Sequence, residues 1–291
     1  MAPASIKTVS NYLSLVKFSH TIFALPFAVI GYFLAIHSTQ TLFDVKLFAL
    51  IILCMVFARS AAMAFNRYID RKIDEQNART AVREIPAGAV KPKSALMFVV
   101  INCVLFISVT YFINSLCFYL SPVALTVVLG YSLTKRFTAL CHVILGIGLS
   151  LAPIGAYLAV TGKFAWLPLF FSFAVLFWVG GFDIIYALQD EEFDKSNNLK
   201  SIPAWLGKSG ALMVSNVFHL ISALFIIYAG IYAHFNVWYW IGTIVFAGLL
   251  IYQHTLVKPN DLSKVNIAFF TTNGIASVVF AAFVLIDLFL K

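Results

Sequence analysis

Three polar side chains stand at four-residue intervals in the stretch FNRYIDRKIDEQNARTAVREIP, residues 65–86: Asn66, Asp70 and Asp74. Arg59 lies seven residues before Asn66, and steps of seven and four keep side chains on one face of a helix. Carboxylates on one face repel each other unless a cation lies between them. Carboxylate and amide oxygens without His or Cys suit a hard divalent ion. Mg²⁺ in particular is held by a few carboxylates together with phosphate oxygens of a substrate.

A second acidic series repeats the steps of seven and four: Asp183, Asp190 and Asp194. Asp183 lies inside the apolar stretch FSFAVLFWVGGFDIIYALQD, and Arg59 lies inside another apolar run. Charges in hydrocarbon are costly, so both side chains are expected to face a polar or aqueous cavity. Acidic residues can also simply end a membrane span, but the repetition favours a metal site. The candidate ligands are Asn66, Asp70, Asp74, Asp190 and Asp194.

Basic residues accompany both acidic series: Arg79, Arg83, Lys135 and Arg136. Arginine binds phosphate through two parallel hydrogen bonds, and lysine acts as a point charge. Membrane topology explains basic residues on one side of a membrane in general, but it does not explain acidic series beside them. Carboxylates, an implied Mg²⁺ and these cations together predict a pyrophosphate site at the membrane surface.

The composition identifies an all-α membrane protein. Of the 291 residues, 62% are hydrophobic and 11% are charged, whereas soluble domains carry roughly 25% charged residues. A membrane-spanning helix needs roughly 20 mostly apolar residues. Nine such runs are present: 19–36, 47–69, 95–113, 116–134, 140–161, 165–189, 211–232, 236–257 and 266–290. They predict a polytopic protein in the lipid bilayer.

The two longest polar loops, 74–94 and 190–210, resemble each other. Each follows an apolar run, continues through acidic and basic residues, and reaches the tripeptide Ile-Pro-Ala. This similarity predicts one domain, 1–291, with two related halves that face one site, roughly 1–134 and 135–291.

The distribution of Lys and Arg predicts the orientation in the membrane. With the N-terminus in the cytoplasm, few of the 20 basic residues lie on the opposite side: Lys46, Lys163 and Lys291. Cytoplasmic loops carry an excess of Lys and Arg. The N-terminus and both polar loops are therefore expected in the cytoplasm, at a bacterial inner membrane. The net charge of +8 reflects this asymmetry, and nucleic-acid binding is not expected.

Neither the cysteines nor the histidines form a recognisable metal or redox motif. All four cysteines fall within predicted spans, and they include no CxxC pair. The histidines are not spaced as metal ligands and are interpreted as hydrogen-bonded or interfacial residues: His20, His37, His142, His219, His234 and His254.

Four ordered motifs resemble those of the UbiA superfamily of intramembrane prenyltransferases: NRYIDRKID (66–74), NARTAVREIPAG (77–88), YSLTKRFT (131–138) and DIIYALQDEEFD (183–194). KFSHTIFALPFAVIG, residues 17–31, is similar to the first helix of that family. The second acidic motif looks most like those of 4-hydroxybenzoate polyprenyltransferases and of futalosine-pathway menaquinone prenyltransferases. Arg67 stands where many relatives have Asp, but it is expected to point away from the acidic face.

The resemblance implies a bundle of nine transmembrane helices around a central cavity, capped by polar cytoplasmic loops. It implies Mg²⁺-dependent transfer of a polyprenyl group from polyprenyl diphosphate to an aromatic acid, of the 4-hydroxybenzoate type, in ubiquinone biosynthesis. The acceptor can instead be 1,4-dihydroxy-6-naphthoate in menaquinone biosynthesis. A protein of another class, a cation-coupled secondary transporter, would also carry embedded charges in two halves, but its site would lie near the midplane.

The resemblance also implies a role for each candidate residue. Asp70 and Asp190 help to hold the ion that neutralises the diphosphate, and Asp183 assists with the hydroxyl proton of the acceptor. Asp183 can alternatively be structural, pairing with Arg59 or holding Asn66. The substrate-binding residues are assigned to the diphosphate (Arg79, Arg83 and Lys135), to the acceptor carboxylate (Arg136, or Lys135 in exchange) and to the allylic cation (Tyr131 and Tyr186), with Arg59 as a further substrate-binding residue.

Overall fold

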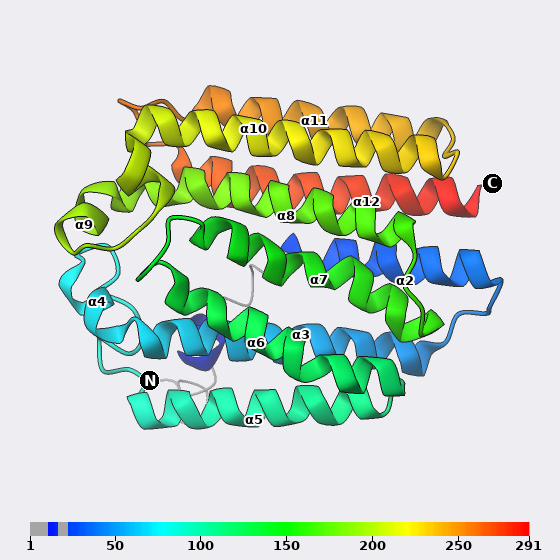
Figure 1. The fold of residues 1–291 in the computed structure, drawn as a ribbon, viewed down its shortest axis with the longest axis horizontal. Coiled ribbons are helices and arrows are strands. Elements are labelled where there is room, and N and C mark those ends of the chain that lie inside the picture. Colours follow the sequence, from blue (N-terminus) through cyan, green and yellow to red (C-terminus); the bar gives the residue numbers. More distant parts are fainter. Residues whose placement is uncertain (1–10, 17–22, 291) are drawn as a thin grey trace, which may run out of the picture.

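The computed structural model describes residues 11–16 and 23–290, and it is built from helices (Figure 1). Within these ranges the only β-type contact is an isolated bridge between Lys258 and Asp261. The elements are α2 (Leu25–Thr39), α3 (Val45–Ile69), α4 (Arg71–Gln76), α5 (Pro92–Tyr111), α6 (Ser115–Thr134), α7 (Cys141–Thr161), α8 (Trp166–Ala187), η2 (Leu188–Asp190), α9 (Glu191–Ser196), α10 (Ile202–Tyr232), α11 (Val237–Leu256), η3 (Ile267–Thr272) and α12 (Asn273–Phe289). The prediction of an all-α protein is confirmed.

The long helices lie side by side with roughly parallel axes, and the short helices α4 and α9 lie at one end of the bundle (Figure 1). α8 packs between α7 and α10, and α7 also packs against α2. α3 packs against α5, and α11 packs against α12. The end formed by α4, α9 and the loops around them is called the polar end below, because the two polar loops predicted from the sequence meet there.

Seven helices in the described part of the chain are long and apolar enough to cross a membrane: α3, α5, α6, α7, α8 with its extension to Ser196, α10, and α12 with η3. The protein is therefore an integral membrane protein. The other two predicted runs correspond to α2, which is 15 residues long, and to α11. For these two helices the predicted crossing of the membrane stays a prediction.

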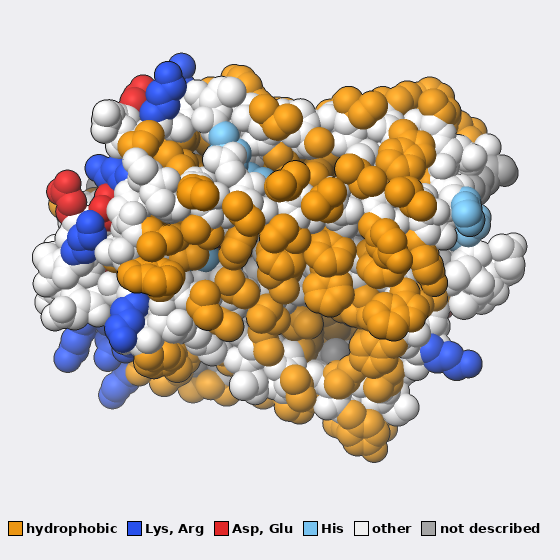
Figure 2. Space-filling view, turned by 45° about the horizontal axis from the view of Figure 1, so that its top comes forward, with side chains coloured by type: hydrophobic (Ala, Val, Ile, Leu, Met, Phe, Trp, Pro, Cys, Tyr) orange, Lys and Arg blue, Asp and Glu red, His pale blue; other side chains and the backbone are white. Residues whose placement is uncertain are grey.

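Apolar side chains cover the flank of the bundle, and charged side chains gather at the polar end (Figure 2). Met97 of α5, Leu220 of α10 and Ile244 of α11 are between 60% and 71% exposed. An extensive exposed apolar surface suits contact with lipid rather than water. The charge distribution agrees with the predicted asymmetry, while the side of the membrane that the polar end faces stays a prediction.

Dense aromatic packing joins α2, α8 and α12. Trp178 and Phe171 of α8, Phe27 of α2 and Phe280 of α12 are fully buried in one cluster. The ring centroids of Phe27 and Trp178 are 5.4 Å apart, within the range of favourable aromatic pairs. Lipid supplies little hydrophobic force between helices, so close packing of this kind holds the bundle together.

α2 and α7 approach each other closely because Gly31 has no side chain. A Cβ atom at Gly31 would lie only 2.1 Å from the carbonyl oxygen of Pro153, which lies inside α7. Small residues that let backbones approach are a main device of helix association in membranes. This contact fixes α7, which carries residues of the candidate site, against α2.

Gly31→Ala is expected to lower the stability by about 1–3 kcal/mol, because the added methyl group overpacks the contact and pushes the two backbones apart. Gly248→Ala is the matched control: Gly248 lies in α11 with open space at its Cβ position, and alanine favours a helix. Thermal unfolding in detergent measures both variants. A midpoint for Gly31→Ala as high as that of the control would contradict the close contact.

Candidate active site

Both acidic series lie at the polar end, and both are interrupted at the same step. α3 ends at Ile69, and Asp70 (φ −87°, ψ 1°) links it to α4. Asp190 (φ −104°, ψ 4°) makes the corresponding link between η2 and α9. These dihedral angles belong to the sparsely populated region between helix and strand. α3 therefore does not continue through the first series as one regular helix, because the backbone leaves helical geometry at Asp70.

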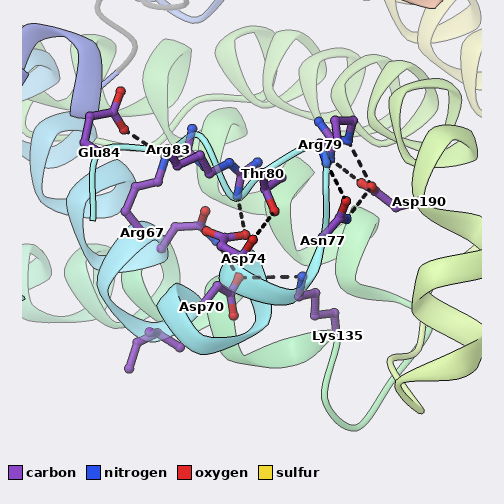
Figure 3. Close-up of polar contacts among 12 residues, drawn as sticks. Arg67, Asp70, Asp74, Asn77, Arg79, Thr80, Arg83, Glu84, Lys135 and Asp190 are labelled. Atoms are coloured by element: carbon purple, nitrogen blue, oxygen red, sulfur yellow. Dashed lines mark hydrogen bonds and ion pairs between the residues drawn. The ribbon is translucent and has the colours of Figure 1, made fainter. Parts of the chain in front are cut away.

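Asp70 is neutralised by the two basic residues that follow α6. Lys135 Nζ lies 3.7 Å from Asp70 Oδ2 (Figure 3), and Arg136 Nη2 donates to Asp70 Oδ1 at 2.9 Å. Asn66 Nδ2 also donates to Asp70 Oδ2, at 3.3 Å. Asp70 is only 2% exposed, so the cations hold a buried charge that would be costly on its own. The motifs at 66–74 and 131–138 thus meet at this carboxylate.

Asp74 follows Asp70 by four residues and is held by Arg83 (Figure 3). Arg83 Nη1 donates to Asp74 Oδ1 at 2.7 Å, and the Thr80 hydroxyl donates to the Asp74 carbonyl oxygen at 3.0 Å. Arg67 is buried and lies 4.0 Å from Glu84. The charge of Asp74 also acts on Arg67, so the expectation that Arg67 points away from the acidic face stays a prediction.

Arg79 connects the first polar loop to the second acidic series (Figure 3). Its Nε donates to Asp190 Oδ1 at 3.0 Å, and its Nη2 pairs with Asp190 Oδ2. Asn77 Nδ2 donates to Asp190 Oδ1 at 3.0 Å, and Arg79 Nη1 donates to the Tyr186 hydroxyl at 2.9 Å. Burial lowers the pKa of the Arg79 guanidinium, but the hydrogen bonds and charge of Asp190 outweigh burial and raise it. The two polar loops therefore form one connected site.

Asp194 is held by the start of α10 rather than by a cation. Ser201 Oγ donates to Asp194 Oδ2 at 2.9 Å. Ser201 Oγ also accepts the Ala204 N–H at 3.3 Å and thereby caps α10. The Lys200 N–H donates to the Lys135 carbonyl oxygen at 2.6 Å. These bonds attach the loop of the second acidic series to the end of α6.

The residues at the polar end fit a hard divalent ion, although they are not gathered around one point. Asp74 Oδ2 is buried and has no hydrogen-bond partner among the described residues, a costly state that a cation would relieve. In the same part of the chain, no three His, Cys, Asp or Glu side chains are grouped so that they could hold an ion. The carboxylates have separate partners instead. Binding of one ion by both series stays a prediction.

An apolar cavity of about 380 Å³ lies among α3, α5, α6 and α7. Arg59 of α3 and Tyr131 of α6 bring a charge and a hydroxyl to its wall. Among the described residues Arg59 Nε is buried without a hydrogen-bond partner. At 1.5 Å per residue, Arg59 lies roughly 16 Å along α3 from Asp70. The family resemblance implied a central cavity. The cavity found here is lined mainly by residues of α3, α5, α6 and α7. Aromatic side chains fill the space among α2, α8 and α12.

Asp183 has a partner that the sequence did not reveal. His142 Nδ1 lies 2.7 Å from Asp183 Oδ2, and His142 Nε2 accepts the Ile202 N–H at 3.4 Å. Because Nε2 accepts the Ile202 N–H, Nδ1 is the nitrogen whose N–H forms the hydrogen bond to the carboxylate. The structural alternatives for Asp183, a pair with Arg59 or a bond to Asn66, are not found among the residues that the structure covers.

Two further contacts lacked a usable sequence signal, one inside the candidate site and one outside it. Asn77 Nδ2 reaches Asp190 across 113 positions of the chain, and although Asn77 opens the motif at 77–88, nothing in the sequence pairs it with Asp190. His219 Nδ1 and His254 Nε2 lie 2.9 Å apart between α10 and α11, although sequence spacing leaves these histidines unrelated. Only tertiary packing brings such pairs together.

The family assignment follows from comparison with known proteins. The family model described as the UbiA prenyltransferase family matches residues 24–275. The chain belongs to this family. A relative named 4-hydroxybenzoate octaprenyltransferase, from Nitrosomonas europaea, is 31% identical over 249 residues, which are 84% of this chain and 84% of the relative.

Solved structures of UbiA homologues have the same fold. A homologue from Aeropyrum pernix K1, solved in its apo form, superimposes with a TM-score of 0.82 at 30% identity and covers 92% of this chain and 98% of its own. A homologue from Archaeoglobus fulgidus, solved with GPP and Mg²⁺, gives a TM-score of 0.73 at 21% identity and covers 96% and 99%. The resemblance of the sequence motifs to the UbiA family is confirmed over almost the whole chain.

In this UbiA-family chain, Arg83→Gln is expected to lower the metal-free stability by about 1.5–3 kcal/mol, because buried Asp74 loses its charged partner. Mg²⁺ with inorganic pyrophosphate is expected to recover part of the loss by binding the folded state. Lys93→Gln is the control, since Lys93 in the first turn of α5 is exposed and forms no ion pair among the described residues. Equal thermal midpoints for the two variants would contradict this account of Asp74.

Proposed function

We propose that this chain transfers a polyprenyl group from polyprenyl diphosphate to an aromatic acid of the 4-hydroxybenzoate type, with Mg²⁺, in quinone biosynthesis. The observation that carries the proposal is the adjacency of a charged site to an apolar cavity. Tyr131 lines the cavity of about 380 Å³, and Lys135 of the charged site follows it by one helical turn. The related 4-hydroxybenzoate octaprenyltransferases, similar along most of their length, support the choice of substrates.

The diphosphate is proposed to bind at the polar end through Arg79, Arg83 and Lys135. In the structure each of these cations faces a carboxylate. Guanidinium groups bind phosphate, like carboxylate, through two parallel hydrogen bonds, and a diphosphate carries more negative charge than one carboxylate. An arriving diphosphate therefore draws these side chains away from the carboxylates, and the carboxylates become free to bind a metal ion.

The carboxylates freed in this way form the proposed metal site, with an amide oxygen: Asn66, Asp70, Asp74, Asp190 and Asp194. The unpartnered, buried Asp74 Oδ2 supports this assignment within the described residues. When bound, Mg²⁺ neutralises negative charge that develops on the departing diphosphate. Asp70 and Asp190 occupy the two breaks between helices, where small changes of backbone angle re-aim a side chain.

The proposed reaction replaces a ring hydrogen of the acceptor by the prenyl group. The C–O bond of the prenyl diphosphate breaks, and both electrons leave with the diphosphate. A ring carbon next to the hydroxyl supplies the electron pair of the new C–C bond, while Asp183 accepts the hydroxyl proton. Loss of the proton from the substituted carbon restores the aromatic ring and the hydroxyl is re-protonated, so one proton is released overall. The apolar cavity keeps water from the allylic cation.

Arg59 is better placed than Arg136 to bind the carboxylate of the acceptor. Arg136 is engaged by Asp70, whereas Arg59 lines the cavity with Nε unpartnered within the described residues. A carboxylate in the cavity would satisfy this buried guanidinium. Tyr131 of the same wall and Tyr186 next to the charged site offer ring faces to the allylic cation.

Two alternatives to this proposal can be tested, another aromatic acceptor and another class of protein. 1,4-Dihydroxy-6-naphthoate also has a carboxylate and hydroxyl groups, so the same residues would serve it. A cation-coupled transporter would need its acidic residues near the midplane, whereas the acidic series here meet arginine and lysine at the polar end. Because basic loops stay on the cytoplasmic side, we propose that the polar end faces the cytoplasm at a bacterial inner membrane. The two related halves are proposed to face one site.

Purified protein with geranyl diphosphate, Mg²⁺ and 4-hydroxybenzoate is expected to form a prenylated acid, detected by mass spectrometry. EDTA is expected to abolish the product, and Asp70→Ala or Asp190→Ala to lower the rate by about 100-fold or more, since charge stabilisation of this kind contributes at least that much. A parallel reaction with 1,4-dihydroxy-6-naphthoate identifies the acceptor.

Lys93→Gln is the control for these variants, because Lys93 is exposed and forms no ion pair among the described residues. If the folded protein forms no product with either acceptor, the quinone branch is ruled out. In that case, tight pyrophosphate binding would direct attention to other acceptors. No binding would favour the transporter.

Arg59→Met is expected to raise the KM for 4-hydroxybenzoate by about 10- to 100-fold, the value of lost charge-assisted hydrogen bonds. The KM for geranyl diphosphate is expected to stay unchanged, because the diphosphate is assigned to the polar end. Arg59→Lys keeps the charge without the planar guanidinium, so its KM for 4-hydroxybenzoate is expected to lie between those of the wild type and Arg59→Met. Steady-state kinetics with each substrate varied separately provide the measurement. A change confined to the diphosphate KM would reassign Arg59.

A further inference from the structure

We propose that His142 is the positioning residue of Asp183: it holds one carboxylate oxygen and thereby aims the other at the hydroxyl of the aromatic acceptor. This inference rests on the proposed function, in which Asp183 accepts the hydroxyl proton. His142 comes from the first turn of α7, whereas Asp183 lies near the end of α8. His142 is 2% exposed, so its orientation is set by the protein.

Both nitrogens of His142 are engaged, which fixes the ring. Nδ1 donates to Asp183 Oδ2 at 2.7 Å, and Nε2 accepts the Ile202 N–H at 3.4 Å. The Asp183 side chain is 23% exposed, compared with 3% for that of His142. Among the described residues Asp183 Oδ1 has no hydrogen-bond partner. One oxygen is therefore anchored, and the other is free to accept a proton from a substrate.

The anchor of His142 belongs to the loop of the second acidic series. Ile202 directly follows the serine whose hydroxyl holds Asp194. The same loop is tied to the segment before α7, because the Lys200 N–H donates to the Lys135 carbonyl oxygen at 2.6 Å. The orientation of His142, and with it that of Asp183, thus depends on the loop that carries a proposed metal ligand. Assembly of the diphosphate site would place the proton acceptor at the same time.

Two variants separate the bonds of His142. His142→Asn puts an amide nitrogen near the position of Nδ1 and keeps a donor for Asp183. His142→Gln puts its amide near Nε2, so it can still accept the Ile202 N–H but loses the bond to Asp183. A misaimed proton acceptor is expected to cost about 10- to 100-fold in kcat. We expect this loss for His142→Gln, a smaller loss for His142→Asn, and an unchanged KM for geranyl diphosphate.

His254→Asn is the matched control, because it removes a histidine from another embedded hydrogen-bonded pair, with His219. It is expected to keep the wild-type kcat. A merely structural His142 would lower the thermal midpoint without lowering kcat, and that result, or an equal kcat for His142→Gln and wild type, would overturn the proposal. Where His142→Gln does not fold, the kcat of His142→Asn decides, with pyrophosphate affinity reporting on its fold.

A double variant tests whether His142 acts through Asp183. In the Asp183→Asn background, His142→Gln is expected to cause no further loss of kcat, because the group that it positions is already gone. Losses that multiply would show an independent role and overturn the proposal. An inactive wild type would overturn the proposed function, and this inference with it, whereas failure of the inference alone leaves an active wild type with unchanged His142 variants.

Discussion

Buried carboxylates at the end of a membrane bundle must be neutralised, and the polar end is organised by this requirement. Asp70, Asp74 and Asp190 each face an arginine or a lysine from another segment. These pairs join the end of α3, the end of α6, the first polar loop and the start of α9 into one unit. Loss of one partner would leave an uncompensated charge in a poorly hydrated place. The ion pairs that neutralise these carboxylates therefore also hold the segments of the site together.

These ion pairs are compatible with the proposed chemistry because both the carboxylates and the cationic side chains can change partners. Carboxylates can pass from guanidinium groups to a metal ion, and guanidinium groups from carboxylates to phosphate oxygens, so that no charge is left bare. The breaks at Asp70 and Asp190 confine the rearrangement to short segments. The long helices, which are held by aromatic packing and close backbone contacts, can keep their places.

Features that depend on local sequence were predictable. Each apolar run became a helix, because lipid requires every backbone group to bond within its own segment. The spacing of Asn66, Asp70 and Asp74 located the polar end, because four-residue steps keep side chains close even across a break. The break itself was not predictable, since the same four-residue spacing occurs whether or not the backbone stays helical at Asp70.

Features that depend on long-range packing were hidden in the sequence. His142 and Asp183 are 41 positions apart and belong to different apolar runs, so no spacing rule connects them. The position of the cavity was equally hidden. Aromatic residues occur along the whole chain, and only the packing of α8 against α2 and α12 decides where they fill space and where the interior stays open.

The clamped position of α7 has a consequence for redesign. This helix touches α2 backbone to backbone at Gly31, carries His142, and forms one wall of the cavity. A substitution that shifts α7 would disturb interhelical packing, the aim of Asp183 and the shape of the chamber in a single step. The opposite walls, α3 and α6, bring Arg59 and Tyr131 to the cavity, and their other lining residues are apolar or small. A library of variants that seeks to accept other prenyl chain lengths or bulkier aromatic acceptors therefore belongs at the apolar lining positions of those two helices. The sequence of α7 is best left unchanged.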